Sequence, residues 1–342
     1  MRHCSRVMTT FSHIPERSGE AVTERSQQPV PDGDKQGTPE QSRVRKETMR
    51  QPATIEREQD VELTGVKAIR SSDLLDAVLC ADNCEAMRVM PSESIDLVVT
   101  SPPYDDLRNY GGHIWDFYGV AWNLKRLLKA GGVIVWVVAD KTVDGNETGT
   151  SMRQALHFQS LGLNLHDTMV YQKAGCPFPE TTRYYPVWEY MFVLSKGKPK
   201  AINLIADQKN NWSGQKAARL HSDRQKDGTI TENSAYRIAP DRQIKEYGIR
   251  ENVWRYSVGR GNTTQDMYAF DHPAMFPEKL AKEHIQSWSN VGDVILDPFA
   301  GSGTTLKAAK ELNRRFIGIE INPDYVQIIN KRLEQSAMPL GV

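Results

Sequence analysis

Short apolar runs alternate with amphipathic stretches over most of the chain after residue 71. The runs at Asp76–Asp82, Ser94–Thr100 and Val133–Ala139 have the length and branched side chains of β-strands, and further strands are expected around Leu165–Gln172 and at Val187–Leu194. Runs that are apolar without alternation indicate strands covered on both faces. The pattern therefore predicts a parallel sheet between two layers of helices.

Apolar residues at helical spacing separate these runs. The spacing predicts a short helix at Cys84–Met90, a helix over 114–128 that stops at Gly131-Gly132, and another near Ser151–Leu161. Strands that alternate with helices are typical of an α/β fold.

The C-terminal part of the chain repeats the alternation. Pro277 opens a predicted helix, since the first helical turn needs no N–H donor there. A strand at Asp293–Phe299, a helix at Thr304–Leu312, a strand at Arg315–Ile321 and a helix from Asn322 to Leu333 follow, with Asn322 as its N-cap. This segment predicts a β-α-β-α unit.

Residues 1–60 are rich in Ser, Gln, Glu, Arg and Pro and show no such period. A segment of this kind cannot bury enough apolar surface to offset the loss of conformational entropy, so a disordered tail is expected. The alternative is a true start further along, at Met8 or Met49.

The stretch from Lys196 to Arg260 is polar and carries 14 Lys and Arg against 7 Asp and Glu, although the whole chain has 43 of each. Basic residues for phosphates and flat rings for bases are what a nucleic-acid-binding surface needs. A solvated loop region with its own small core is the alternative. The aromatic residues interleaved with these charges are Trp212, Tyr236, Tyr247, Trp254 and Tyr256.

The remaining composition narrows the class of protein. The cysteines Cys4, Cys80, Cys84 and Cys176 are scattered without the Cys-x-x-Cys spacing of a metal or redox site. No apolar run reaches the ~18 residues that a membrane span needs. We therefore expect a cytoplasmic protein without a metal site.

A glycine-rich turn, Asp297 to Thr305, lies between a predicted strand and a helix, where glycines let the backbone approach a ligand. A P-loop would need Lys at Thr304, and a dinucleotide fingerprint would need Gly at Leu306. A nucleoside without a pyrophosphate remains. Glu320, at the end of the next strand, is placed to accept hydrogen bonds from ribose hydroxyls; a surface carboxylate is the alternative reading.

The segment Ser101-Pro102-Pro103-Tyr104 follows a predicted strand. It therefore lies at the carboxyl end of the sheet, where ligands bind in open α/β folds. The prolines fix the chain and leave its carbonyls rigidly aimed. Ser101 and the Pro102 carbonyl offer two acceptors for an aromatic amine, and the Tyr104 ring can stack on a base and stabilise the charge that develops. A proline-stiffened loop without chemistry is the alternative.

Taken together, TSPPY and DPFAGSGTT resemble the motifs of the β group of amino-methylating DNA methyltransferases. The resemblance covers about Asp76 to Leu333 and implies a Rossmann-like, seven-stranded, mostly parallel sheet. It implies a catalytic half at 71–195, a target-recognition region at 196–260 and an S-adenosylmethionine-binding half at 268–336.

The resemblance also implies roles for individual residues. Ser101, Pro102, Pro103 and Tyr104 would be catalytic, Asp82 would lie near the cofactor adenine, and the segment from His272 to Pro277 would close over its methionine end. The residues expected to bind the cofactor are Asp82, Phe276, Pro277, Asp297, Pro298, Phe299, Ala300, Gly301, Gly303, Thr304 and Glu320.

The implied activity is methyl transfer from S-adenosylmethionine to the exocyclic amine of a base flipped out of double-stranded DNA. Ser101 as the first residue of the tetrapeptide is the pattern associated with N4 of cytosine, and N6 of adenine is the alternative. An RNA or protein-amide methyltransferase and a catalytically silent DNA-binding protein are further alternatives. A cognate restriction endonuclease is a candidate partner, and the oligomeric state stays open.

Overall fold

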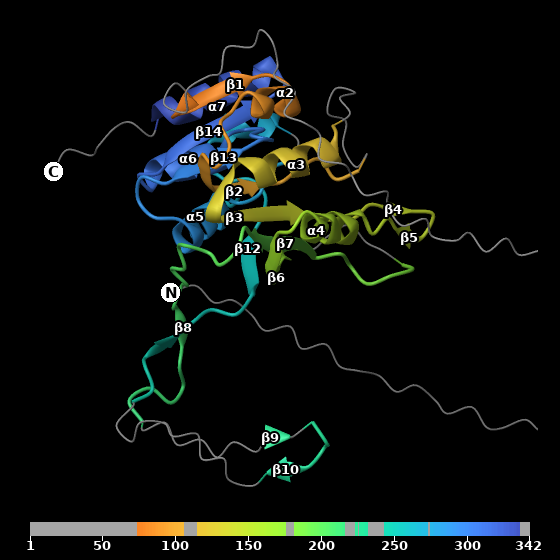
Figure 1. The fold of residues 1–342 in the computed structure, drawn as a ribbon, viewed down its shortest axis with the longest axis vertical. Coiled ribbons are helices and arrows are strands. Elements are labelled where there is room, and N and C mark those ends of the chain that lie inside the picture. Colours follow the sequence, from red (N-terminus) through yellow and green to blue (C-terminus); the bar gives the residue numbers. More distant parts are fainter. Residues whose placement is uncertain are drawn as a thin grey trace, which may run out of the picture. The chain divides into compact units, whose positions relative to one another are not determined.

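The computed structural model describes residues 74–105, 115–175, 181–215, 223–224, 226–231, 243–272 and 274–335 (Figure 1). All of the described residues belong to one unit of the chain, Leu63–Val342. The expected tail at 1–60 lies outside the described residues. Among the described residues, no helix is long and apolar enough to cross a membrane.

An eight-stranded sheet forms the centre of this unit, and its strand order is β1-β14-β13-β2-β3-β7-β6-β12. The strands from β1 to β3 in this order pair in parallel, β7 is antiparallel to both neighbours, and β12 pairs in parallel with β6. Their bounds are Ala77–Cys80 (β1), Arg315–Glu320 (β14), Val294–Asp297 (β13), Ile95–Thr100 (β2), Leu128–Val138 (β3), Trp188–Ser195 (β7), Asn164–Ala174 (β6) and Val253–Ser257 (β12).

The predicted Rossmann-like, mostly parallel α/β class is confirmed, but the sheet has one strand more than the seven expected. The additional strand, β12, lies within the stretch assigned to the target-recognition region. It was missed because only alternate residues of β12 are buried, which leaves no continuous apolar run.

Two helix layers cover the sheet (Figure 1). Every position of β2 is buried, with Leu97 and Val99 in the core cluster shared with α5, α6 and α7, and Val98 in the cluster shared with α2, α3 and α4. This two-sided burial explains the unbroken apolar runs. The helices are Asn83–Arg88 (α2), Phe117–Leu127 (α3), Thr150–Ser160 (α4), Glu278–Trp288 (α5), Thr304–Glu311 (α6) and Pro323–Gln335 (α7).

Two predicted helix boundaries are corrected. The helix expected to stop at Gly131-Gly132 ends at Leu127, and both glycines lie inside β3, where a Cβ at Gly132 would meet Leu128 Cγ at 2.8 Å. Pro277 is the N-cap of α5 and not its first helical residue. The expected cap of the last helix is present, since the Asp324 amide donates to Asn322 Oδ1 at 2.9 Å.

Two short antiparallel strand pairs lie among the described residues of the basic insert, which follows β7 from Lys196 onwards. Strand β8 (Gln208–Lys209) pairs with β11 (Tyr247–Gly248), and β9 (Asp223–Arg224) pairs with β10 (Ile230–Thr231). A further small hairpin, β4 (Thr142–Val143) with β5 (Asn146–Glu147), follows β3, and a 3-10 helix, η1 (Met267–Asp271), precedes α5.

Only some of the interleaved aromatic residues can face a ligand. Trp254 and Tyr256 are each 6% exposed and belong to the core, because strand pairing turns alternate residues of β12 inward. Trp212 is 65% exposed and Tyr247 45%. Tyr236 lies outside the described residues. The prediction of a stacking role is therefore wrong for Trp254 and Tyr256.

Replacing the two tryptophans separates these roles. Trp254→Ala is expected to lower the free energy of unfolding by about 3–5 kcal/mol, because removal of a buried ring leaves a cavity. Trp212→Ala, the matched change at an exposed position, is expected to shift it by less than about 0.5 kcal/mol. Chemical denaturation measures both values, and similar small losses would place Trp254 outside the core.

Candidate active site

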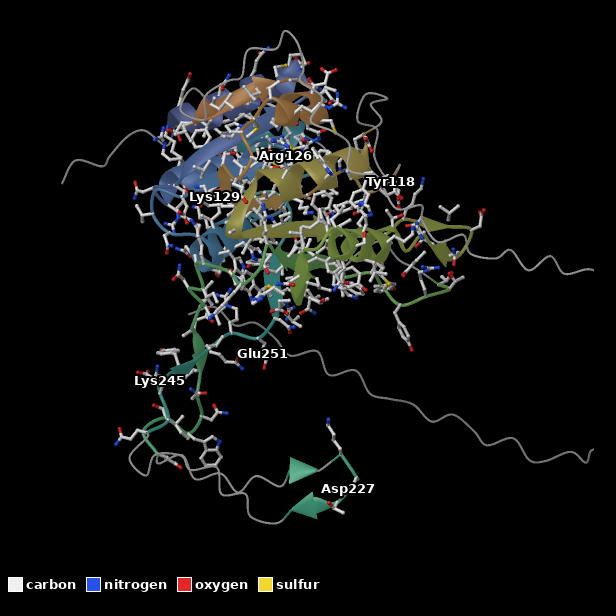
Figure 2. All side chains as sticks on the ribbon, in the orientation of Figure 1. Tyr118, Arg126, Lys129, Asp227, Lys245 and Glu251 are labelled. Carbon is white, nitrogen blue, oxygen red and sulfur yellow. The ribbon has the colours of Figure 1, made fainter. Side chains whose placement is uncertain are left out.

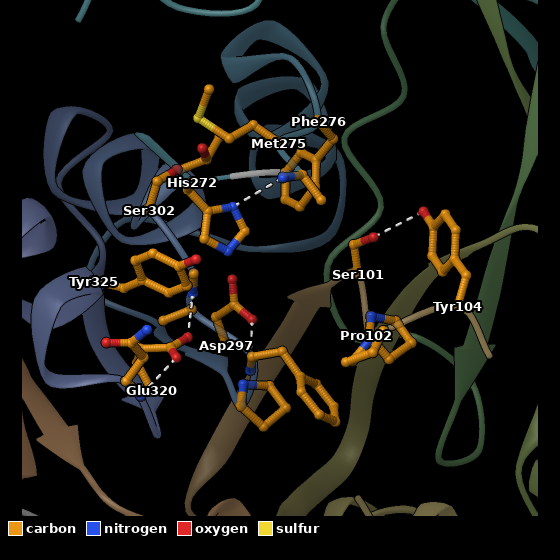
Figure 3. A pocket seen from close by; sticks show the side chains of 18 of the residues that line it. Ser101, Pro102, Tyr104, His272, Met275, Phe276, Asp297, Ser302, Glu320 and Tyr325 are labelled. Atoms are coloured by element: carbon orange, nitrogen blue, oxygen red, sulfur yellow. Dashed lines mark hydrogen bonds between the residues drawn. The ribbon is translucent and has the colours of Figure 1, made fainter. Parts of the chain in front are cut away.

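A cavity of about 470 Å³ opens at the carboxyl ends of β1, β14, β13 and β2 (Figure 3). All of the predicted catalytic and cofactor residues line it except Pro277 and Gly303. Pro277 is buried at the start of α5, and Gly303 is the N-cap of α6, so both lie beside the cavity within the backbone that shapes it.

The glycine turn at 298–303 depends on backbone conformations that favour glycine. Gly301 has φ +53° and Gly303 has φ +81°. A Cβ at Gly301 would lie 2.9 Å from His272 Nε2, and a Cβ at Gly303 would lie 3.0 Å from Ile329 Cγ2. Gly301 therefore lets His272 approach the floor of the cavity, whereas Gly303 permits α7 to pack against the turn.

The carboxylate of Glu320 holds this turn to the end of β14. Its Oε2 accepts from the Gly301 amide at 2.8 Å and its Oε1 from the Asn322 amide at 2.9 Å. Glu320 is 9% exposed, so it is not the surface carboxylate of the alternative reading. A carboxylate has more acceptor positions than these two amides use, and Glu320 also lines the cavity.

Asp297 is the most deeply buried acidic residue of the cavity, at 2% exposed. Its Oδ1 accepts from the Thr100 hydroxyl at 2.6 Å and from the Phe299 amide at 3.1 Å. Burial first, and the nearby Glu320 carboxylate, raise the pKa of Asp297 to about 6, against the opposing effect of these hydrogen bonds. A cationic ligand beside Asp297 would offset the cost of its charge.

Residues from other elements complete this end of the cavity. The Asp82 side chain caps α2 by accepting from the Glu85 amide at 3.0 Å, and Asn83 Nδ2 donates to the Pro298 carbonyl at 3.2 Å, which ties α2 to the glycine turn. His272 is 9% exposed and packs edge-on against Tyr325, with ring centroids 4.5 Å apart. Met275 and Phe276 line the same cavity (Figure 3).

The second end of the cavity is built around Ser101 and Tyr104 (Figure 3). Ser101 Oγ lies 2.8 Å from the Tyr104 hydroxyl, which donates to Glu189 Oε2 at 2.9 Å. Lys173 Nζ lies 2.5 Å from Glu189 Oε1. Pro102 is buried, and Pro103 lies half-buried beside it.

Sequence reasoning missed several residues that line the cavity, above all Glu189, Lys173, Asn83 and Tyr325. Glu189 had one visible signal, because it is the only charged residue of the otherwise apolar run at Val187–Leu194. The others carry no local signal, since only the folding of β6, α2 and α7 brings them to the cavity.

Comparison with known proteins gives consistent results. The family model described as DNA methylase, for N6 and N4 methyltransferases, matches residues 95–331. The orphan methyltransferase M.BamHII of Bacillus amyloliquefaciens is 54% identical over 242 residues, which span 70% of this chain and 89% of that protein. The DNA adenine methyltransferase YhdJ of Escherichia coli strain K12 is 26% identical over 288 residues, which span 79% of this chain and 87% of YhdJ.

A solved structure supports the fold. The cytosine-N4-specific PvuII DNA methyltransferase aligns over 78% of this chain and 87% of its own, with a TM-score of 0.54 and 21% identity. At that identity the likeness concerns the fold alone.

The sheet order, the glycine turn and the acidic residue that follows it define an α/β methyltransferase of the Rossmann-like class. The chain belongs to the DNA methylase family of N6-adenine and N4-cytosine enzymes. It is accordingly a DNA methyltransferase with S-adenosylmethionine as its cofactor. The cavity fits that cofactor, because the carboxylates of Asp82, Asp297 and Glu320 line it and the cofactor carries a positive charge.

The raised pKa of Asp297 has a measurable consequence for stability. Its ionised form destabilises the folded chain in full above about pH 6, and this penalty fades as the pH falls towards the ordinary value of 3.8. Asp297→Asn is expected to raise the unfolding free energy by on the order of 1–3 kcal/mol at pH 8 and to leave it nearly unchanged near pH 4.

Thermal unfolding of both proteins without cofactor, across this pH range, measures the difference. Other titratable groups are the same in both proteins, so their contributions to the pH dependence cancel when the two unfolding free energies are subtracted. A gain of the same size at both pH values would show that the buried charge of Asp297 is not its cause.

Proposed function

We propose that this methyltransferase modifies the exocyclic amine of a DNA base that has left the duplex, and that the amine is N4 of cytosine. The observation that carries the proposal is that Ser101–Tyr104, the glycine turn at 298–303 and Glu320 line one cavity. A methyl donor held by the turn and an amine held by Ser101 would then lie within the same cavity. The base must leave the duplex to reach it.

The cofactor end of the cavity is assigned from its acceptors. Glu320 would accept from the ribose hydroxyls, Asp82 would lie near the adenine, and Asp297 would face the positive charge. Pro298, Phe299, Ala300 and Thr304 would line the bound molecule, and Phe276 would cover its methionine end. Pro277 and Gly303 would act through the backbone, by fixing the start of α5 and α6. When bound, S-adenosylmethionine supplies an electrophilic methyl group on a sulfonium.

The other end of the cavity would prepare the amine. The lone pair of an aromatic amine is delocalised into the base, which makes it a weak nucleophile. Ser101 Oγ and the Pro102 carbonyl, held in place by Pro103, would accept its two N–H bonds and draw the nitrogen towards tetrahedral geometry. The Tyr104 ring would stack on the base and stabilise the positive charge that develops on it.

The choice of cytosine is based on Ser101, which offers a neutral acceptor in place of the aspartate that the resemblance associates with N6 of adenine. Adenine is the alternative, and the 26% identity to YhdJ, named as an adenine enzyme, favours it. M.BamHII is named an orphan methyltransferase, so a cognate endonuclease is not part of the proposal.

Target recognition is assigned to the basic insert, residues 196–252, because β12 belongs to the sheet. Its charge would contact phosphates, and the exposed Trp212 and Tyr247 are its described candidates for stacking on bases. The flanking parts, 71–195 and 268–336, would be the catalytic and the cofactor-binding halves.

One incubation tests the activity. Purified protein, labelled S-adenosylmethionine and unmethylated genomic DNA are combined, the DNA is digested, and the labelled nucleoside is identified. N4-methylcytosine is the expected product. Labelled N6-methyladenine would show that the target base is adenine and not cytosine. Label found in RNA alone would show that the substrate is RNA, and the absence of label in any nucleic acid would favour a catalytically silent DNA-binding protein.

The stacking role of Tyr104 predicts a large loss on truncation. Tyr104→Ala is expected to lose most of the activity, because a base–aromatic stack contributes about 1–3 kcal/mol. Tyr118→Ala is the control, since Tyr118 lies on α3, is 67% exposed and does not line the cavity (Figure 2). Unchanged turnover in Tyr104→Ala would show that the Tyr104 ring does not stack on the base.

The ribose role of Glu320 can be tested by changing protein and ligand together. Titration calorimetry compares S-adenosylhomocysteine with its 2′-deoxy analogue. The unmodified protein is expected to prefer the hydroxylated ligand by about tenfold or more, and Glu320→Ala is expected to bind both weakly and without preference. A preference that persists in Glu320→Ala would assign the hydroxyl contact to another residue.

A further inference from the structure

A chain of polar contacts leads from Ser101 away from the reacting end of the cavity. Ser101 Oγ lies 2.8 Å from the Tyr104 hydroxyl, that hydroxyl donates to Glu189 Oε2 at 2.9 Å, and Lys173 Nζ lies 2.5 Å from Glu189 Oε1. All four residues line the cavity. We call Ser101, Tyr104, Glu189 and Lys173 the serine relay.

The proton count fixes the direction of the relay. An ionised carboxylate can only accept, and a phenol has a single proton, which Tyr104 gives to Glu189. The contact between Ser101 and Tyr104 therefore has the serine hydroxyl as donor. Once its only proton points to Tyr104, Ser101 Oγ meets the substrate with lone pairs alone.

We propose that Glu189 is a positioning residue that makes Ser101 an obligatory hydrogen-bond acceptor, so that the site selects a base bearing an amino group over one bearing a carbonyl oxygen. The inference rests on the proposed function of Ser101. It assigns the discrimination between amine and carbonyl to a residue that lies 88 positions after Ser101 in the chain and does not touch the base, but acts through the hydroxyls of Tyr104 and Ser101.

Strand pairing keeps Glu189 in this state. Glu189 on β7 pairs with Tyr171 on β6, and Lys173 lies two residues further along β6, on the same face of the sheet. Glu189 is 9% exposed, so its charge is largely removed from water and the Lys173 ammonium supplies the compensating partner. The ion pair thus holds the Glu189 side chain in place as the acceptor of the Tyr104 hydroxyl.

Glutamine at position 189 would remove this constraint. Its amide NH₂ can donate to the Tyr104 hydroxyl, which can then donate to Ser101 Oγ, and the serine proton is free to turn towards the base. A serine that donates suits a carbonyl oxygen and opposes an amine. Tyr104→Phe breaks the same relay one step earlier while it retains the stacking ring.

A double-mutant cycle tests the relay. Methyl transfer is measured at saturating cofactor and DNA for the unmodified protein, Glu189→Gln, Tyr104→Phe and the double variant. Each single change is expected to lower kcat by about tenfold or more with little change in the KM for the cofactor, and the double variant is expected to be no slower than Tyr104→Phe. Losses that multiply in the double variant would overturn the proposal.

A second readout measures selection directly. Short duplexes carry the methylation site found with genomic DNA, either with the target base or with its carbonyl counterpart, uracil for cytosine or hypoxanthine for adenine. The unmodified protein is expected to bind the amino duplex about tenfold more tightly, and Glu189→Gln and Tyr104→Phe are expected to lose that preference. Should Glu189→Gln fail to fold, Tyr104→Phe alone decides, and a preference that it retains overturns the proposal.

Glu283→Gln is the matched control. Glu283 is also a buried, ion-paired carboxylate that accepts from a tyrosine, with Tyr256 Oη at 2.5 Å and Arg250 Nη1 at 2.7 Å, but it does not line the cavity. Its effect on kcat is expected to multiply with that of Tyr104→Phe, unlike the effect of Glu189→Gln. Absence of methyl transfer by the unmodified protein would refute the proposed function itself, an outcome distinct from a cycle that shows no coupling.

Discussion

Strands β2 and β13 come from distant parts of the chain and pair in parallel, with Leu97 opposite Ile295 and Val98 opposite Leu296. Beyond this ladder the Thr100 hydroxyl donates to Asp297 Oδ1 at 2.6 Å across 197 positions of sequence. Because the carboxyl ends of parallel strands lie on the same side of the sheet, the pairing places the turn after β2 next to the turn after β13. Ser101–Tyr104 and the glycine turn line one cavity because of this alignment.

The cavity and the basic insert carry opposite charges. Asp82, Glu189, Asp297 and Glu320 line the cavity, with Lys173 as the partner of Glu189, so its lining suits a cofactor that carries positive charge. The stretch from Lys196 to Arg260, which contains the basic insert and β12, carries the opposite excess, with 14 Lys and Arg against 7 Asp and Glu. An overall charge of zero therefore conceals a cavity lined by carboxylates and a stretch of sequence rich in Lys and Arg.

Elements with a clear local sequence pattern, and the segments that line the cavity, were predicted well. Strands β2 and β3 could be predicted because burial on both faces gives an unbroken apolar run. The glycine turn could be predicted to bind a nucleoside because it has neither the Lys of a P-loop nor the third Gly of a dinucleotide-binding motif. Lys173 meets Glu189 because β6 and β7 pair, and Glu189 accepts from Tyr104 across 85 positions of sequence, which no local pattern encodes. Trp254 and Tyr256 were misassigned for the converse reason, since a half-buried edge strand resembles a polar segment.

The eighth strand bears on how such an enzyme can change its target. Ser195, at the end of β7, and Val253, at the start of β12, both pair with β6, so the sheet fixes the two ends of the insert. Lengthening a flexible connection between fixed ends costs little, about 0.6 kcal/mol for each doubling. The segment between these strands, to which target recognition is assigned by proposal, can therefore be exchanged or extended while the cavity is inherited unaltered.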